Sequence, residues 1–262
     1  MSALEEAAAR LRGGGVVAFT GAGISAESGI PTFRDPGGIW DRFDPEEYGT
    51  WDGVMRLAMT RPDELADFLA ELRRTMAAAE PGNAHRALAL LEEAGLLEAV
   101  ITQNVDGLHQ RAGSRVVLEL HGSLSRVVCL VCGRRATVDR DDLLASLDRA
   151  IVGLRTAFVP SLASLLPRCP ACGGPARPDF VAFTEPVQGL PAARSMARGC
   201  ETLLVVGTHG DVYPAAEIPV VAREGGAAVV EVSTGRTFID SDLRIRGPAG
   251  RILPALVDLV LA

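Results

Sequence analysis

Five short apolar runs, each ending in small or polar residues, dominate the pattern of this chain. They cover residues 16–20, 96–102, 116–120, 202–207 and 227–232. Residues 51–79, and a second stretch that opens at Pro81-Gly-Asn83 and stops at Gly95, have apolar residues at helical spacing. Strands that alternate with helices predict a doubly wound α/β fold with a parallel sheet. Ligands bind beyond the carboxyl ends of such strands, so the polar clusters there are the predicted site.

The first strand leads into a glycine loop. VVAFT is followed by Gly21, Ala22 and Gly23, with Ala26 completing the G-x-G-x-x-G/A spacing of dinucleotide-binding loops. Backbone N–H groups of such a turn can face a phosphate, although an ordinary tight turn has the same pattern. A dehydrogenase would continue into a second strand, whereas residues 28–45 are rich in Gly, Pro and Asp. The sequence therefore disfavours hydride transfer.

The charged residues exclude several function classes. All 26 basic residues are arginine, so a Walker lysine, a Schiff-base lysine and a lysine general base are impossible. The net charge is −7 and no basic block occurs, which argues against a nucleic-acid partner. No apolar run approaches the roughly 18 residues of a membrane span, and the acidic start does not resemble a secretory leader. A cytoplasmic protein is expected.

Two C-x-x-C pairs predict a metal site. Cys129 and Cys132 form the first pair, Cys169 and Cys172 form the second, and Cys200 stands apart. In a cytosolic chain such pairs indicate one tetrathiolate zinc ion rather than disulfides. Four thiolates leave no open position for water, so this Zn²⁺ would be structural. Cys200 is predicted to be a buried thiol.

Five segments in a fixed order resemble the sirtuins, which are NAD-dependent protein-lysine deacylases. The segments are GAGISAESGIPTFRDPGGIW (21–40), TQNVDGLHQRAGS (102–114), ELHGS (119–123), the two C-x-x-C pairs and VYPAAEIP (212–219). The resemblance runs from about residue 11 to 258. It implies a Rossmann-like large domain with a smaller inserted helical and zinc-binding module, and an active site in the cleft between them. The expected large domain covers residues 1–37, 82–125 and 178–262, the helical module 38–81 and the zinc module 126–177.

The resemblance also assigns residues to NAD. Gly21, Ala22 and Gly23 match the pyrophosphate loop, and Phe33 and Arg34 match the flexible cofactor loop. Gln103, Asn104 and Asp106 match the pocket for the nicotinamide amide and the ribose hydroxyls, which needs both donors and acceptors. The complete predicted cofactor-binding set is Gly21, Ala22, Gly23, Ser25, Phe33, Arg34, Gln103, Asn104, Asp106, Gly207, Thr208, His209, Ser233 and Ala249.

His121 matches the general base of the family. Histidine titrates near neutrality, and this one follows a predicted strand. The implied reaction starts when the acyl-lysine oxygen attacks the ribose carbon as nicotinamide departs. His121 then deprotonates a ribose hydroxyl, with Asn104 and Asp106 as the other predicted catalytic residues. The products are free lysine, nicotinamide and O-acyl-ADP-ribose. His85 is expected to be structural, and His109 to position the loop after Gln103.

The acyl group is predicted to be uncharged, with acetyl favoured. Relatives that accept succinyl carry a tyrosine and an arginine on the helix before the Pro-x-Asn turn, but residues 63–79 contain no tyrosine. Phe180, Val181 and Phe183 match the strand that clamps the acylated lysine peptide by strand addition.

Three positions depart from the family pattern. His209 stands where serine is usual, Ser233 where asparagine is usual, and Thr184 where glycine is usual. Replacing asparagine by serine shortens the side chain and removes an amide donor, so weaker or water-mediated ribose contacts are expected.

The 36 residues between the C-x-x-C pairs are also unusual, because zinc ribbons have about 15–20. Leu143, Leu147, Ile151 and Leu154 lie at helical spacing, followed by a more apolar run. We expect an extra helix packed on the zinc module; the alternative is a partner or oligomer surface. The sequence does not indicate the oligomeric state.

Two other functions fit the same scaffold. One is ADP-ribosyl transfer or NAD hydrolysis, and the other is a non-catalytic sensor of NAD or ADP-ribose. The altered residues His209 and Ser233 motivate the sensor. The combination of Gln103, Asn104, Asp106 and His121 argues against it, because a sensor would not need all four.

Overall fold

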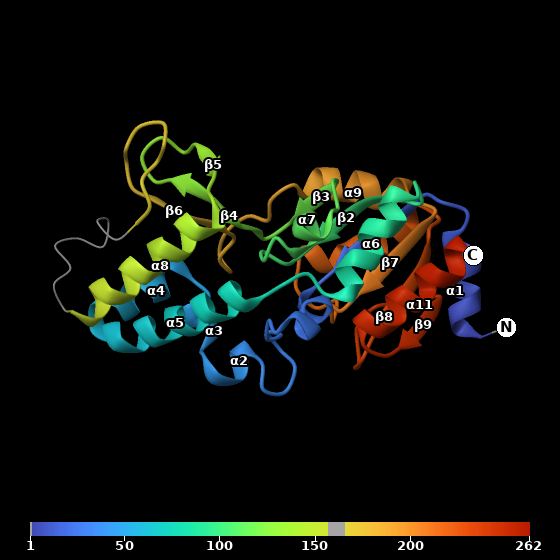
Figure 1. Cartoon of the computed structure of the whole chain (residues 1–262), viewed down its shortest axis with the longest axis horizontal. Coiled ribbons are helices and arrows are strands. Elements are labelled where there is room, and N and C mark those ends of the chain that lie inside the picture. The colour runs from blue at the N-terminus through green and yellow to red at the C-terminus, as the bar shows by residue number, and fades with distance from the viewer. Residues whose placement is uncertain (1, 157–165) are drawn as a thin grey trace. The chain divides into compact units, whose positions relative to one another are not determined.

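The computed structural model describes residues 2–156 and 166–262 (Figure 1). It divides into two compact units. Unit 1 consists of Met1–Thr32, Glu80–His121 and Val187–Ala262, and unit 2 of Phe33–Ala79 and Gly122–Pro186. The segments predicted as separate helical and zinc modules fall together in unit 2. No helix among the described residues is long and apolar enough to cross a bilayer.

Unit 1 is built on a parallel sheet of six strands, which confirms the predicted α/β class. The strand order is β3-β2-β1-β7-β8-β9. The bounds are β1 Val16–Thr20, β2 Leu97–Thr102, β3 Val117–Glu119, β7 Thr202–Val206, β8 Ala228–Ser233 and β9 Leu243–Arg246. Five of these strands match the predicted runs. β9 was not predicted, because the arginines of LRIR interrupt an apolar pattern at the edge of the sheet.

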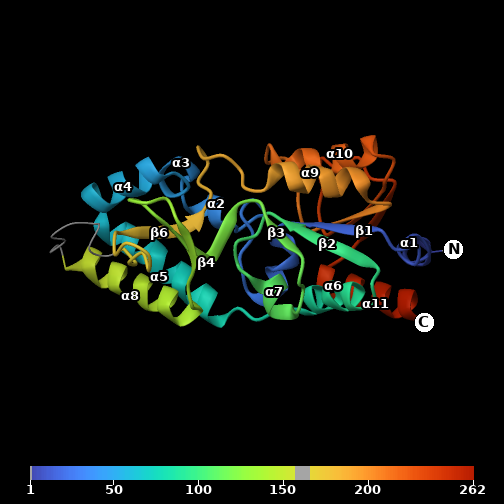
Figure 2. The same cartoon turned by 90° about the horizontal axis from the view of Figure 1, so that it is seen from above.

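Helices cover both faces of this sheet, α6 and α11 on one side and α9 and α10 on the other (Figure 2). Apolar residues of α1, α6 and α11 pack with one set of strand side chains, and those of α9 and α10 with the other set. The helix bounds are α1 Ala3–Leu11, α6 Asn83–Glu93, α7 Leu108–Ala112, α9 Leu190–Gly199, α10 Ile218–Glu224 and α11 Ala249–Leu261. The short 3₁₀ helices are η1 Ala22–Ile24, η2 Ala26–Ser28 and η4 Ala215–Glu217. Both faces of the sheet are therefore covered, which explains the nearly continuous apolar runs of its strands.

Unit 2 contains a helical part that differs from the prediction in one respect. Residues 51–79 form two helices, α4 Trp51–Thr60 and α5 Pro62–Ala78, preceded by α2 Ile39–Arg42 and α3 Pro45–Tyr48. The break lies at Arg61 because Pro62 has no N–H to continue α4 and instead occupies the first turn of α5.

The segment between the C-x-x-C pairs forms the predicted helix, α8 Arg140–Arg155. Its main packing partner is α5, and it contacts β4 to a smaller extent, so the predicted packing on the zinc module is confirmed only in part. Leu154 joins a buried cluster with Leu57 and Leu65 of the helical part. The Arg140 guanidinium donates to backbone oxygens at the end of α5, including Ala77 O at 3.1 Å. The apolar run that follows α8 falls on residues 157–165, outside the described residues.

The zinc-module segment carries a second, antiparallel sheet with strand order β5-β4-β6. Its strands are β4 Gly122–Cys129, β5 Arg135–Thr137 and β6 Ala176–Phe180. Gly122 has φ of +79°, and a Cβ there would lie 1.9 Å from the carbonyl oxygen of Asp179. Glycine is therefore required where β4 begins against β6.

Candidate active site

The glycine loop after β1 interlocks with the loop after β7. A Cβ on Gly23 would lie 2.7 Å from Gly207 Cα, and a Cβ on Gly21 would lie 2.8 Å from Thr208 Cβ. Gly207 has φ of +62°. Gly23 N–H donates to Gly207 O at 2.8 Å. The predicted pyrophosphate loop and the predicted adenosine-side loop thus meet without side chains between them.

A second group of predicted residues converges on Ser25. The Asn104 amide donates to Gly21 O at 3.2 Å and to Ser25 Oγ at 3.1 Å. Ser25 Oγ donates to Asp106 Oδ2 at 2.7 Å. The Gln103 amide reaches Thr208 Oγ1 at 2.9 Å, which connects this group to the β7 loop. Residues from separate segments therefore meet beyond the ends of β1, β2 and β7.

His85 belongs to the same hydrogen-bond chain, although the sequence indicated only a structural role. Gly82 N–H donates to His85 Nδ1 at 3.2 Å, so the neutral ring carries its proton on Nε2, which lies 3.3 Å from Ser25 Oγ. Burial lowers the pKa of His85. The neutral ring can therefore donate toward Ser25, which donates in turn to Asp106.

His109 is buried next to His85. Its Nε2 is 2.9 Å from Thr20 Oγ1, and its ring contacts that of His85. Burial and the neighbouring His85 lower the pKa of His109 to about 3. His109 is thus a neutral, buried side chain that connects α7 to the end of β1.

His121 follows β3 and is half-buried. Its Nδ1 lies 3.0 Å from the carbonyl oxygen of Gln103. A carbonyl only accepts, so Nδ1 carries the proton, and the lone pair of the neutral imidazole resides on Nε2. The backbone of the predicted amide pocket therefore sets the tautomer that a general base requires.

Two predicted adenosine-side residues lie at the ends of β8 and α11. The Ser233 side chain is buried and donates to Glu231 Oε1 at 2.8 Å. The Ala249 methyl group belongs to a buried apolar cluster, so only its backbone remains to meet a cofactor. His209 is joined to a neighbouring loop through its carbonyl oxygen, which accepts from Phe238 N–H at 2.8 Å.

In unit 2, the ring of Trp40 packs between those of two predicted site residues, Phe33 and Phe183. Phe33 packs on Trp40 with 5.5 Å between ring centroids, and Trp40 packs on Phe183 at 5.6 Å. Phe33 and Phe183 stay exposed, as does the neighbouring Arg34. Phe183 N–H donates to Gly49 O at 3.0 Å, which fixes the backbone after β6.

Glu185 organises the predicted peptide-binding segment. It accepts from Trp51 Nε1 at 3.1 Å and from Ala182 N–H at 3.0 Å, and it forms an ion pair with Arg177. The Trp51 ring stacks on Phe180, with centroids 4.7 Å apart. Val181 lies between Phe180, which stacks on Trp51, and Ala182, which donates to Glu185. Trp51 and Glu185 could not be predicted from the sequence, because their contacts join segments far apart in the chain.

The four predicted zinc ligands come together. Their sulfur atoms all lie within 4.8 Å of one another. The separations include 3.5 Å between Cys129 and Cys172 and 3.8 Å between Cys132 and Cys169. A tetrahedron with Zn–S bonds of about 2.3 Å has edges of about 3.8 Å, so the four thiols fit a zinc ion. N–H donors of Cys132 and Val131 lower the pKa of Cys129 to about 6, which favours the thiolate that binds metal.

Cys200 is separate from this cluster. It is buried, and its thiol donates to Ala197 O at 3.1 Å. Burial raises its pKa to about 11. The predicted buried thiol is confirmed.

Comparison with known proteins agrees with this geometry. The model of the Sir2 family matches residues 21–214. The chain belongs to the Sir2 family. It is 41% identical over 262 residues to an NAD-dependent protein deacylase of Desulfosudis oleivorans, covering 99% of this chain and 96% of that protein. It is 44% identical to an NAD-dependent protein deacylase of Thermococcus kodakarensis over 92% of this chain and 89% of the relative.

Solved Sir2 structures have the same fold. One, described under the structural basis for the mechanism and regulation of Sir2 enzymes, is 40% identical with a TM-score of 0.79 and covers 98% of this chain and 97% of that one. A Sir2 homologue in complex with NAD is 34% identical with a TM-score of 0.79, covering 98% and 93%. A Sir2 protein bound to a myristoylated histone peptide is 36% identical with a TM-score of 0.72, covering 98% and 96%.

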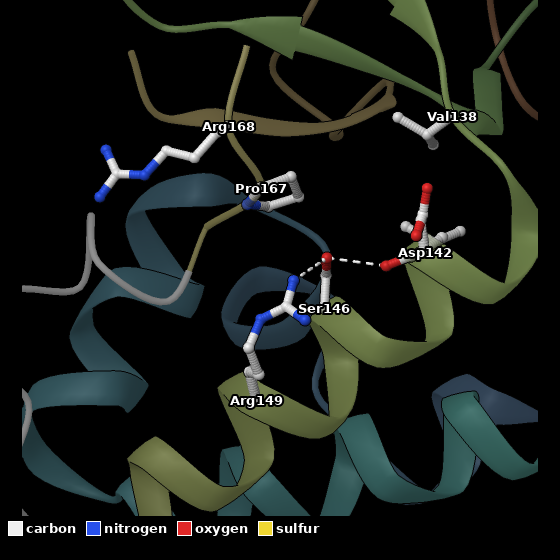
Figure 3. A pocket seen from close by; sticks show the side chains of 7 residues that line it. Val138, Asp142, Ser146, Arg149, Pro167 and Arg168 are labelled. Atoms are coloured by element: carbon white, nitrogen blue, oxygen red, sulfur yellow. Dashed lines mark hydrogen bonds between the residues drawn. The ribbon is translucent and has the colours of Figure 1, made fainter. Parts of the chain in front are cut away.

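A cavity of about 210 Å³ in unit 2 contains none of the residues predicted from the Sir2 motifs (Figure 3). It is lined by Val138, Asp142, Leu143, Ser146, Arg149, Pro167 and Arg168. Its polar side chains are already engaged in part, since Arg149 donates to Ser146 Oγ at 2.7 Å and Ser146 Oγ donates to Asp142 O at 2.8 Å. The Sir2 motif residues therefore define the candidate active site, and this cavity does not.

Proposed function

We propose that this chain removes acyl groups, with acetyl favoured, from lysine side chains of proteins and uses NAD as co-substrate. The observation that carries the proposal is the fixed tautomer of His121. Its Nδ1 is bonded to Gln103 O, and Gln103, Asn104 and Asp106 are joined to the two glycine loops. The relatives named as NAD-dependent protein deacylases, and the Sir2 complexes with NAD and with an acylated peptide, support the same function.

In this mechanism the residues of unit 1 hold NAD. The loop of Gly21, Ala22 and Gly23 binds the pyrophosphate, and its two glycines allow it to pack closely on Gly207 and Thr208. The amide of Asn104 and the carboxylate of Asp106 hold the nicotinamide amide and the ribose. These groups orient the co-substrate so that the carbonyl oxygen of the acyl-lysine can attack the ribose carbon as nicotinamide departs.

His121 moves the proton. Its Nε2 accepts the proton of a ribose hydroxyl, and the ribose oxygen then attacks the acyl carbon of the alkylimidate that the first step formed. The lysine amine departs from that carbon, and one water molecule adds to it to complete the O-acyl ester. The products are free lysine, nicotinamide and O-acetyl-ADP-ribose. In unit 2, Phe180, Val181 and Phe183 contact the extended peptide, and Phe33 and Arg34 are the residues that match the cofactor loop of the family. Cys129, Cys132, Cys169 and Cys172 would hold a zinc ion that fixes β4 to the segment before β6 and supplies no chemistry to the reaction. A cytoplasmic location is proposed with the function.

The His121→Ala variant tests the role of the base. We expect its kcat for deacetylation of an acetyl-lysine peptide to fall at least about 100-fold, as for loss of a general base. His209→Ala is the matched control. It removes the same side chain from the adenosine side, so KM for NAD should change while kcat is largely retained. Full deacetylation by His121→Ala would overturn the assignment.

A further inference from the structure

A buried carboxylate lies behind the adenosine-side serine. Glu231, in the middle of β8, is 1% exposed. Its oxygens accept from Ser233 Oγ at 2.8 Å, Thr237 Oγ1 at 2.7 Å and Ser241 Oγ at 3.0 Å. Arg244 Nε donates at 2.8 Å and balances the charge. Four donors from β8, the following loop and β9 thus surround one carboxylate, which is the arrangement that makes a buried charge tolerable.

We call Glu231 and its four donors, Ser233, Thr237, Ser241 and Arg244, the Glu231 ring. Hydrogen bonds join this ring to the candidate cofactor site. Gly207 N–H donates to Val232 O at 3.1 Å, next to Ser233, and Phe238 N–H donates to His209 O at 2.8 Å. The loop that carries Thr237 therefore lies against the residues after β7. Ser233 is the member of the ring that belongs to the predicted cofactor-binding set.

Glu231 determines what Ser233 can offer to a ligand. A hydroxyl has one proton, and the carboxylate, which only accepts, takes it. Ser233 Oγ can then present only its lone pairs to a further group. That group must be a donor, as a ribose hydroxyl is. An ionised phosphate ester in the same place only accepts hydrogen bonds, so its oxygens would face the lone pairs of Ser233 Oγ and no donor.

We propose that Glu231 is a positioning residue which, through Ser233, makes the adenosine side select NAD over its 2′-phosphorylated form. In dinucleotide-binding folds an acidic side chain often binds the ribose 2′-hydroxyl directly. Here the carboxylate of Glu231 does not contact the ribose itself. It acts through the Ser233 hydroxyl, to which it is hydrogen-bonded. The inference rests on the proposed function only in taking NAD as the ligand.

Calorimetric titration with ADP-ribose and with 2′-phospho-ADP-ribose tests this inference without requiring catalysis. Wild type is expected to bind ADP-ribose at least about tenfold more tightly. Ser233→Ala should weaken ADP-ribose binding about threefold to tenfold, the effect of one lost hydrogen bond, and leave the phosphorylated ligand unchanged. The ratio of the dissociation constant for 2′-phospho-ADP-ribose to that for ADP-ribose therefore falls toward one.

Ser241→Ala is the matched control. It removes another donor to Glu231 but no ligand-facing hydroxyl, so the ratio should stay at the wild-type value. Glu231→Gln offers Ser233 an amide donor and should narrow the ratio as Ser233→Ala does. If that variant does not fold, the comparison of Ser233→Ala with Ser241→Ala decides. The inference would be overturned if Ser233→Ala and Ser241→Ala had the same ratio of the two dissociation constants, or if wild type bound ADP-ribose and 2′-phospho-ADP-ribose equally tightly. Failure of wild type to bind either ligand would instead contradict NAD as co-substrate.

Discussion

At the scale of residues, environment gives identical side chains different chemistry. His121 is half-buried and bonded through Nδ1 to a backbone carbonyl, which leaves Nε2 as the basic atom. His109 is 1% exposed, and burial lowers its pKa to about 3. The base role of His121 and the loop-positioning role of His109 stay predictions from the sequence. The contact of His85 with Ser25 could not be predicted, because it joins residues 60 positions apart.

The buried His109 predicts a pH dependence of stability. Its folded pKa of about 3 lies below the value of about 6.5 in an unfolded chain. Below pH 6.5 the unfolded chain binds a proton that the folded chain does not. His109 therefore lowers the free energy of unfolding by about 1.4 kcal/mol for each pH unit between 6.5 and 3, and has no effect above pH 7.

Urea unfolding of wild type and His109→Gln at pH 7 and pH 5 measures this contribution. Glutamine keeps a donor for Thr20 but does not titrate. We expect wild type to lose more stability than the variant over this interval. If wild type and the variant lost the same free energy of unfolding between pH 7 and pH 5, the pKa of His109 would be the same in the folded and the unfolded chain.

The close approach of the two glycine loops predicts the effect of a single methyl group. The Cβ of Gly23→Ala would lie 2.7 Å from Gly207 Cα, which is backbone and cannot rotate away. We expect NAD to bind at least about tenfold more weakly and stability to fall by about 1–3 kcal/mol. Gly199→Ala, at the end of α9, meets nothing within 4 Å and is the control. If the Gly23→Ala variant bound NAD like wild type, the interlocked loops would be contradicted.

At the scale of elements, five of the six strands of unit 1 could be predicted almost to the residue, because each of the five is a short apolar run followed by a glycine or polar cluster. The break between α4 and α5 follows from Pro62 and was missed because the apolar spacing continues across it. The packing of α8 on α5 could not be predicted, because an apolar stripe does not say which surface covers it. Trp51 and Glu231 were missed for a related reason: their partners are set by tertiary contacts.

The zinc module gives a prediction at this scale. The fit of four thiols to one tetrahedron predicts one zinc ion per chain, measured by elemental analysis. Cys132→Ala should lose the metal and lower the melting temperature, because binding of a structural zinc is coupled to folding. Cys132 is exposed, so its loss costs little packing. Cys200→Ala removes a buried thiol outside the cluster and should keep its zinc. Full zinc content in Cys132→Ala would contradict the tetrathiolate site.

At the scale of the whole molecule, the functional residues divide between the two units. Unit 1 holds the predicted NAD contacts and His121, and unit 2 holds the four clustered cysteines, the predicted cofactor-loop residues Phe33 and Arg34, and the predicted peptide contacts. The chain has no lysine, so an enzyme that acts on acyl-lysine contains no lysine side chain of its own to be modified. Its substrate lysine must come from another protein.

The most direct test of the central claim is nicotinamide release with and without an acetyl-lysine peptide, followed by the masses of the products. We predict that release depends on the peptide and equals the amounts of free lysine peptide and O-acetyl-ADP-ribose formed. Release at the same rate without peptide, with free ADP-ribose or ADP-ribosylated protein as product, would contradict the deacylase function.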